Sequence, residues 1–214
     1  MYKYYNVFIL LIFVSFYSCD DNIIKNNNPV YSLVTNINGE VFDLPAGTKN
    51  IKATVQMDFT SFIIDSIIVD TSNFMFLNLD PPPPEFPYNI QQLFLPDTNI
   101  FISDRDANVN ILHIFTFDTS NHFTGGLYKN NHISNPLNEG YFDVTYLYCD
   151  RLVRITGNSK TVDNLDTNFV NYNIDLGIGW NVTTVKRKTQ RKNFIEIDIY
   201  NGESEGGNWY FSDN

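Results

Sequence analysis

Hydrophobic and polar positions alternate in short runs along most of this chain. The clearest run is 193–200, where Ile195, Ile197 and Ile199 occupy every second position. A period of two is that of a strand with one buried face, and no window of helical length keeps a 3.6-residue period. Similar runs cover 31–42, 50–58, 62–69, 74–79, 109–118, 123–129, 141–148, 151–157, 170–176, 181–188 and 194–200. The pattern predicts an all-β fold of two antiparallel β-sandwich modules.

Consecutive prolines interrupt the pattern once, at Pro81–Pro84, and Pro87 follows shortly after. Prolines lack the amide donor and hold an extended left-handed conformation, so no central strand can run through them. We therefore expect 80–100 to connect two modules, the first over 30–80 and the second over 101–214. The competing interpretation is a proline-rich ligand for a recognition domain.

The first residues of the chain have the pattern of a secretory signal peptide. Val7–Val14 is an unbroken apolar run with one cation, Lys3, before it. A helix that spans a bilayer needs about 20 apolar residues, so this run is too short to cross a membrane. A weakly positive start, a short apolar centre and a small residue at the exit predict cleavage after residue 18. A buried N-terminal element of the domain is the alternative.

Ser18 and Cys19 end this apolar run, and together they resemble the lipobox of bacterial lipoproteins. Phe16 and Tyr17 depart from the usual pattern, as they do in loose lipoboxes of the Bacteroidetes type. The resemblance implies that Cys19 carries the lipid anchor and that 19–29 forms a flexible tether. Plain cleavage of the signal, with Cys19 left as a thiol, is the alternative.

Two acidic residues, Asp20 and Asp21, follow the predicted lipidation site. An acidic pair at this place resembles the surface-export signal of Bacteroidetes lipoproteins. This implies a protein anchored to the outer membrane and displayed at the cell surface. In enterobacterial lipoproteins an aspartate after the cysteine implies retention at the inner membrane, so an inner-membrane-anchored periplasmic protein is the alternative.

The first predicted module resembles the transthyretin-like, carboxypeptidase-regulatory type of β-sandwich over about 50 residues. A Gly-x-Val strand, a proline-containing turn and a later Asp-led turn carry the match, at Gly39, Val41, Pro45, Gly47 and Asp70. Asn73 stands where the family has a second glycine, and asparagine is the best substitute where φ is positive. Met75 replaces the family's phenylalanine. The resemblance implies an accessory or structural module without an active site.

Charge and cysteine content narrow the range of partners. The formal net charge is −10, and removal of the signal peptide with Lys3 makes it more negative. This balance argues against nucleic acid as a partner and against general attraction to anionic lipid. The only other cysteine, Cys149, alternates with Leu147 and Thr145, so we expect a buried thiol and no disulfide in the mature chain.

Motifs for metal or cofactor chemistry are weak, and we predict neither a metal site nor a cofactor. Alternate oxygen ligands occur at Asp104, Asp106, Asn108 and Asn110. An EF-hand loop also needs a glycine and a glutamate that are missing at the required places, so we expect a turn before a strand. The three histidines, His113, His122 and His132, lack the close spacing of zinc enzymes.

The remaining candidates are aromatic and basic residues that could contact a ligand. Trp180 and Trp209 each follow glycine near the head of a strand, where they pack in the core or offer a platform for a sugar. Five of the seven residues over 186–192 are cations, which favours a solvated hairpin tip or a contact for an anionic glycan or an envelope protein. These basic candidates are Lys186, Arg187, Lys188, Arg191 and Lys192.

The sequence thus predicts a lipid-anchored envelope protein that acts by non-catalytic binding or scaffolding. The rival hypothesis is a carbohydrate-binding or glycan-acting component of an outer-membrane uptake system. In that case Trp180, Trp209, Glu196 and Asp198 would line one groove, and catalytic use of the two carboxylates would need pKa values driven apart by burial.

Overall fold

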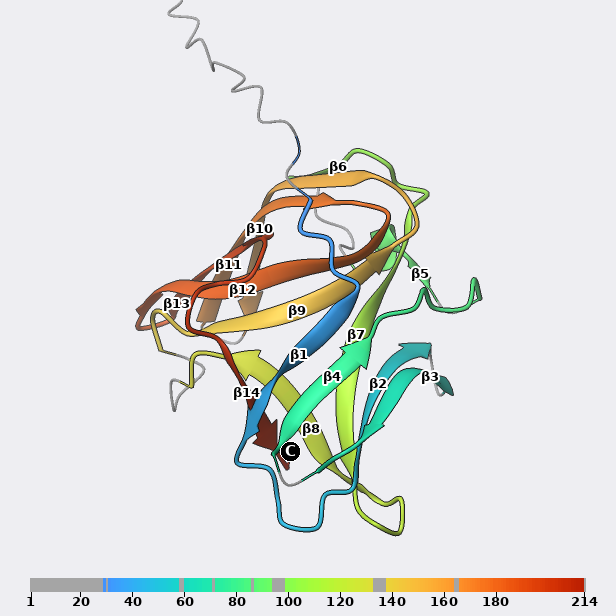
Figure 1. The fold of residues 1–214 in the computed structure, drawn as a ribbon. Coiled ribbons are helices and arrows are strands. Elements are labelled where there is room, and N and C mark those ends of the chain that lie inside the picture. The colour runs from blue at the N-terminus through green and yellow to red at the C-terminus, as the bar shows by residue number, and fades with distance from the viewer. Residues whose placement is uncertain are drawn as a thin grey trace, which may run out of the picture.

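A computed structural model describes residues 29, 31–57, 60–70, 72–85, 87–93, 99–132, 138–163 and 166–213. The predicted signal peptide, Cys19 and nearly all of the tether lie outside the described residues. Figure 1 shows a fold built of strands, with one 3-10 turn, η1, at Ile90–Gln92. The strands are β1 Asn36–Phe42, β2 Asn50–Met57, β3 Thr60–Ile68, β4 Phe74–Asn78, β5 Tyr88–Asn89, β6 Ile100–Ile102, β7 Asn108–Phe117, β8 Phe123–Asn130, β9 Phe142–Cys149, β10 Val153–Asp163, β11 Asp166–Leu176, β12 Gly179–Arg191, β13 Phe194–Asn201 and β14 Asn208–Ser212.

The all-β prediction is confirmed over the described residues. Every strand range expected from the alternating pattern overlaps a strand of the structure. The expected ranges do not include β5, β6 and β14, of which β5 and β6 contain two and three residues and border the proline-rich segment. Strands of two or three residues are too short to show a period of two in the sequence. They are held in place by pairing with longer neighbours.

The sheet is mixed, whereas purely antiparallel sheets were expected. Its strand order is β4-β1-β14-β8-β7-β9-β12-β13-β11-β10-β6, and β2 pairs with both β7 and β3. Most pairs are antiparallel, but β1 pairs with β14 and β11 pairs with β13 in parallel. The first and last strands thus lie side by side, with Val41 opposite Trp209. Pairing between chain ends leaves no trace in the local alternation of either strand.

Strands from both sides of the predicted connector belong to this one sheet. Besides the β1–β14 pair, β2 and β7 pair over six positions, from Asn50 opposite Phe117 to Val55 opposite Leu112. The predicted connector packs against the rest, since Ile90 is fully buried and the Asp80 carbonyl accepts a hydrogen bond from the Trp180 indole at 2.9 Å. The arrangement differs from two separate sandwich modules divided at 80–100.

The core has two parts, and they lie on opposite faces of the central strands. Even-numbered positions of β7 and β9, such as Leu112 and Val144, belong to the first core, and odd-numbered ones, such as Val109 and Cys149, belong to the second. Successive side chains of a strand point to opposite faces, so the same strands serve both cores. The first core also includes side chains of β1, β2, β4, β8, β12 and β14, and the second includes those of β10 and β11.

The segment that resembles a transthyretin-like module forms a turn of the kind expected. Asn73 has φ of 54°, so asparagine occupies the left-handed position that the missing glycine would take. Its carbonyl accepts the amide of Val41 at 2.9 Å, and the Asp70 carboxylate accepts the Ser72 amide at 2.8 Å. The tight turn therefore survives without glycine, and it leads directly into β4.

Candidate functional site

A fork between three strands creates the cavity that we regard as the candidate site. β7 pairs with β9 as far as Ile111 opposite Leu147, and it pairs with β8 only from Phe115 onward. β8 in turn joins β9 from Lys129 opposite Val144. Within the described residues, the positions between these pairings have no strand partner across the fork. They are 112–114 of β7, 127–128 of β8 and 145–146 of β9.

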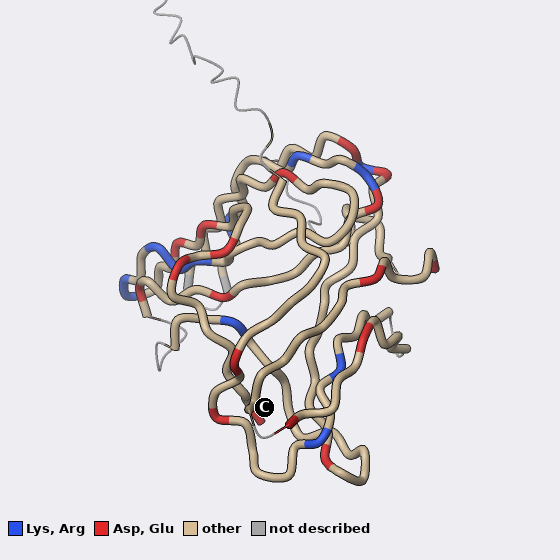
Figure 2. Tube along the Cα trace, viewed as in Figure 1, with Lys and Arg blue, Asp and Glu red and all other residues tan. Residues whose placement is uncertain are grey.

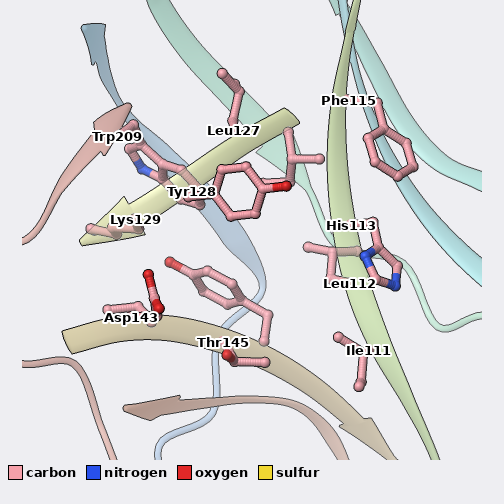
Figure 3. Close-up of a pocket in the computed structure, with 13 residues that line it drawn as sticks. Ile111, Leu112, His113, Phe115, Leu127, Tyr128, Lys129, Asp143, Thr145 and Trp209 are labelled. Carbon is pink, nitrogen blue, oxygen red and sulfur yellow. The ribbon is translucent and has the colours of Figure 1, made fainter. Parts of the chain in front are cut away.

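A partly open cavity of about 240 Å³ lies at the fork. Because the ladder is open there, side chains of both sheet faces reach it, as Figure 3 shows for residues of β7, β8, β9 and β14. Tyr146 and Trp209 are almost fully buried, with their rings stacked at 6.0 Å between centroids. His113 stacks on Phe115 at 5.8 Å on the β7 side. The lining residues are 111–115, 127–129, 143–146 and 209.

Four side chains of this lining carry hydrogen-bonding groups that no other described residue engages. They are the His113 imidazole and the hydroxyls of Tyr128, Thr145 and Tyr146. None of these four is among the buried side-chain atoms without a partner, and Tyr128 is 48% exposed, so their polar groups are open to solvent. Because they converge on one cavity, they are available to a polar molecule that enters it.

The charged residues of the lining are compensated by neighbours. The Lys129 ammonium forms an ion pair with Glu203 at 2.6 Å. The Asp143 carboxylate accepts a hydrogen bond from the Tyr141 hydroxyl, and burial raises its pKa while the nearby Arg187 charge opposes that rise. Burial also lowers the pKa of His113, which favours the neutral imidazole at pH 7. The cavity is polar without a strong net charge.

The structure corrects the interpretation of the tryptophans as exposed platforms. Trp180 and Trp209 are each 3% exposed, so neither presents a ring face to solvent. Trp180 packs edge-on against Tyr148 at 5.5 Å. Large rings gain most from full burial in the core, and both indoles find hydrogen-bond acceptors there. Only Trp209 contributes to the fork cavity.

The basic segment forms the β12–β13 hairpin, and its charges are mixed with acidic ones (Figure 2). Lys188 forms ion pairs with Glu196 at 3.3 Å and with Asp198 at 3.7 Å. Arg191 and Lys192 are exposed at the turn. A hollow of about 430 Å³ beside the hairpin is lined by residues that include Lys186, Arg187, Lys188, Glu139 and Asp198. The Lys188 charge is therefore partly compensated by the carboxylates of Glu196 and Asp198.

Glu196 and Asp198, the candidate acid and base, are held by a structural network. Asn171 donates to both carboxylates, at 3.2 Å and 2.8 Å, and Lys188 lies beside them. Neither carboxylate lines the fork cavity where Trp209 lies. The four residues of the proposed groove are thus not brought together.

The oxygen-rich segment forms a turn and the start of β7. The Asp104 carboxylate accepts the Asp106 amide at 2.9 Å, and the Asn108 side chain donates to Asp150 at 2.8 Å. Asn110 is 2% exposed. No group of three or more His, Cys, Asp or Glu side chains in the described part of the chain is arranged to hold a metal ion.

The other singled-out residues have structural surroundings. His122 lies 3.5 Å from the Asp118 carboxylate, and His132 stacks on Tyr210 at 4.2 Å. Cys149 is free and fully buried in the second core, as expected, and burial raises its pKa to about 11. Its thiol is unreactive by position and by protonation.

Comparisons with known proteins identified no relative of this chain. No protein family matches the sequence, and no curated protein or solved structure matches the chain. No helix among the described residues is long and apolar enough to cross a membrane. The candidate site therefore depends on its own geometry.

Proposed function

We propose that this chain is a lipid-anchored protein of the bacterial cell envelope that binds a ligand in the fork cavity and catalyses no reaction. The observation that carries the binding role is the set of four partnerless polar side chains, His113, Tyr128, Thr145 and Tyr146, around one cavity. A site built for binding needs such groups directed at the ligand, within an otherwise apolar and aromatic lining.

The same geometry favours binding over catalysis. An acid–base pair needs two titratable groups with pKa values set far apart, both within reach of one substrate atom. Glu196 and Asp198 of β13 instead share the side-chain amide of Asn171 on the neighbouring strand β11. In the fork cavity, the Asp143 carboxylate accepts a hydrogen bond from the Tyr141 hydroxyl.

The anchor rests on Ser18-Cys19 at the end of the apolar run. A diacylglycerol and an N-acyl chain together give stable attachment, since one chain alone binds only reversibly. The described chain then attaches to the domain through the Val34 amide, which donates to the Trp180 carbonyl, and the Val182 amide, which donates to Ser32. About a dozen residues separate Cys19 from this point, so the domain stays within about 40 Å of the membrane.

The acidic pair Asp20-Asp21 supports display at the outer-membrane surface in this proposal. An inner-membrane anchor facing the periplasm remains the alternative location. In either place the tether is long enough to keep the cavity accessible to soluble ligands.

Metabolic labelling with palmitate tests the anchor. The wild-type protein, produced in a bacterium of the matching type, should take up label and stay with the membrane fraction. Cys19→Ala should abolish both, whereas Cys149→Ala is the matched control and should keep them, because Cys149 is buried in the folded domain. An unlabelled wild-type protein released into the medium would contradict the proposal.

A further inference from the structure

We propose that the fork cavity binds a single, neutral, hydroxyl-bearing ring, the chemistry of one sugar residue. This inference rests on the proposed binding function and names the ligand class for the same site. It follows from the size of the cavity, the aromatic pairs around it, its mixed hydrogen-bonding groups and its balanced charge.

The size of the cavity limits the ligand to one ring. Pockets for drug-sized ligands have volumes of about 300–1,000 Å³. The fork cavity, at about 240 Å³, is smaller than this range. The cavity is partly open to solvent, so its volume bounds the part of a ligand that it holds to about one ring. A single six-membered ring with its substituents is of the right order.

The lining presents aromatic rings in two stacked pairs. Tyr146 and Trp209 are stacked with an interplanar angle of 11°, and His113 and Phe115 with one of 7°. The first pair lies between β9 and β14, and the second belongs to β7, so the pairs come from different sides of the fork. The Tyr146–Trp209 pair is almost fully buried, so the half-exposed Tyr128 ring is the aromatic face that can pack against the C–H groups of a saturated ring. Figure 3 shows the Tyr128 ring between β8 and β7, close to both sides.

The hydrogen-bonding groups suit hydroxyls, which both donate and accept. The hydroxyls of Tyr128, Thr145 and Tyr146 can each donate or accept, and a neutral imidazole such as that of His113 does one at each nitrogen. An anion would need donors only, and a cation would need acceptors only.

The balance of charges in the lining favours a neutral ring over a charged one. Lys129 is neutralised by Glu203 at 2.6 Å, and its ammonium also lies over the Trp209 ring at 5.6 Å. Asp143 accepts the Tyr141 hydroxyl and lies near the Arg187 charge. A charged ligand would therefore meet no free counter-charge in the cavity, and desolvation would weaken its binding.

Saturation-transfer NMR and calorimetry on the full mature lipoprotein in detergent micelles test this inference. The probes are the methyl glycosides of glucose, galactose and N-acetylglucosamine, with glucuronate and glucosamine as charged counterparts. The neutral probes should bind in the millimolar range, more tightly than their charged counterparts. Thr145→Val and Tyr146→Phe each remove one hydroxyl of the lining and should weaken binding about tenfold.

Two further variants keep the test decisive. Tyr128→Phe removes a hydroxyl from a half-exposed ring, so the variant should fold even if Tyr146→Phe does not. Tyr31→Phe removes a tyrosine hydroxyl outside the fork lining and should leave binding unchanged. Thermal unfolding of each variant confirms that the fold is intact.

Three results would overturn the inference. Folded wild-type protein that binds none of the neutral probes would exclude the ligand class. Binding that all three cavity variants retain in full would exclude the site. Tighter binding of glucuronate or glucosamine would exclude the neutral ring. None of these results changes palmitate uptake at Cys19, and loss of that uptake would leave sugar binding intact, so the two proposals fail separately.

Discussion

Gly39 in β1 offers a direct test of how the chain ends are joined. A Cβ atom at this position would lie 2.9 Å from Cδ1 of Trp209, on the neighbouring strand β14. Gly39 also has φ of +149°, a conformation that side chains rarely adopt. Gly39→Ala should therefore force the Trp209 indole to move, and that indole is 3% exposed in the first core.

The magnitude follows from two separate costs. Unfavourable φ values cost about 1–3 kcal/mol, and an extra methyl in a packed site costs about 1–3 kcal/mol. Gly47 is the matched control, because its φ is +97° and nothing lies within 4 Å of its Cβ position. Both substitutions restrict the unfolded chain equally, so this effect cancels in their comparison. The difference between the two variants, about 2 kcal/mol, reports the contact with Trp209.

Thermal unfolding followed by tryptophan fluorescence measures this difference, since both indoles are buried. For a domain of this size 1 kcal/mol corresponds to about 2–4 °C. Gly39→Ala should therefore unfold about 4–8 °C below Gly47→Ala. Adding Trp209→Leu should remove most of that difference, because the clash has lost its partner. Equal unfolding temperatures for the two alanine variants would refute the β1–β14 packing.

Three further predictions concern the cores, the cavity and the domain division. Cys149 should react with thiol reagents at pH 8 about a hundredfold more slowly in the native protein than in the unfolded chain, because burial raises its pKa to about 11; rapid native labelling would contradict its burial. Because burial lowers the pKa of His113, the unfolded state binds more protons than the folded state at acidic pH. The contribution of neutral His113 to stability is therefore present above pH of about 6.5 and declines as the pH falls below that value. The free energy of unfolding of His113→Phe, measured by urea titration, should lose this part of the pH dependence, and an unchanged profile would contradict it. A protease site engineered between Leu93 and Asn99 should yield two fragments that stay together on size exclusion, because β1–β14 and β2–β7 pairs join them; fragments that separate and remain folded would favour two modules.

Local alternation was sufficient to predict most of the strands, because burial of one face imposes it on each strand separately, but it did not predict the short strands β5, β6 and β14. Asn73 could also be predicted, since few residues other than glycine adopt a positive φ readily. Pairing partners could not be predicted in this way. The β2–β7 and β1–β14 pairs join segments far apart in sequence, and a proline-rich segment between them looks the same whether it links two domains or packs on one.

Most of the candidate site could not be predicted from the sequence, for the same reason. Of its partnerless polar residues, the sequence singled out only His113, by residue type. Nothing in the sequence distinguishes Tyr128, Thr145 and Tyr146 from other positions of alternating strands. Only the divergence of β7 from β9 brings them together. Conversely, the basic run 186–192 stood out in the sequence, yet Lys188 is paired with two carboxylates of the adjacent strand.

Amide chemical-shift mapping tests the central claim, that the fork between β7, β8 and β9 is the ligand site. Labelled protein is titrated with methyl glucoside, methyl galactoside and the methyl glycoside of N-acetylglucosamine. We predict that a bound probe shifts the amides of 112–114, 127–128 and 145–146 together, with one dissociation constant. Shifts that cluster instead at the 186–192 hairpin, or an absence of shifts with every probe, would contradict the claim.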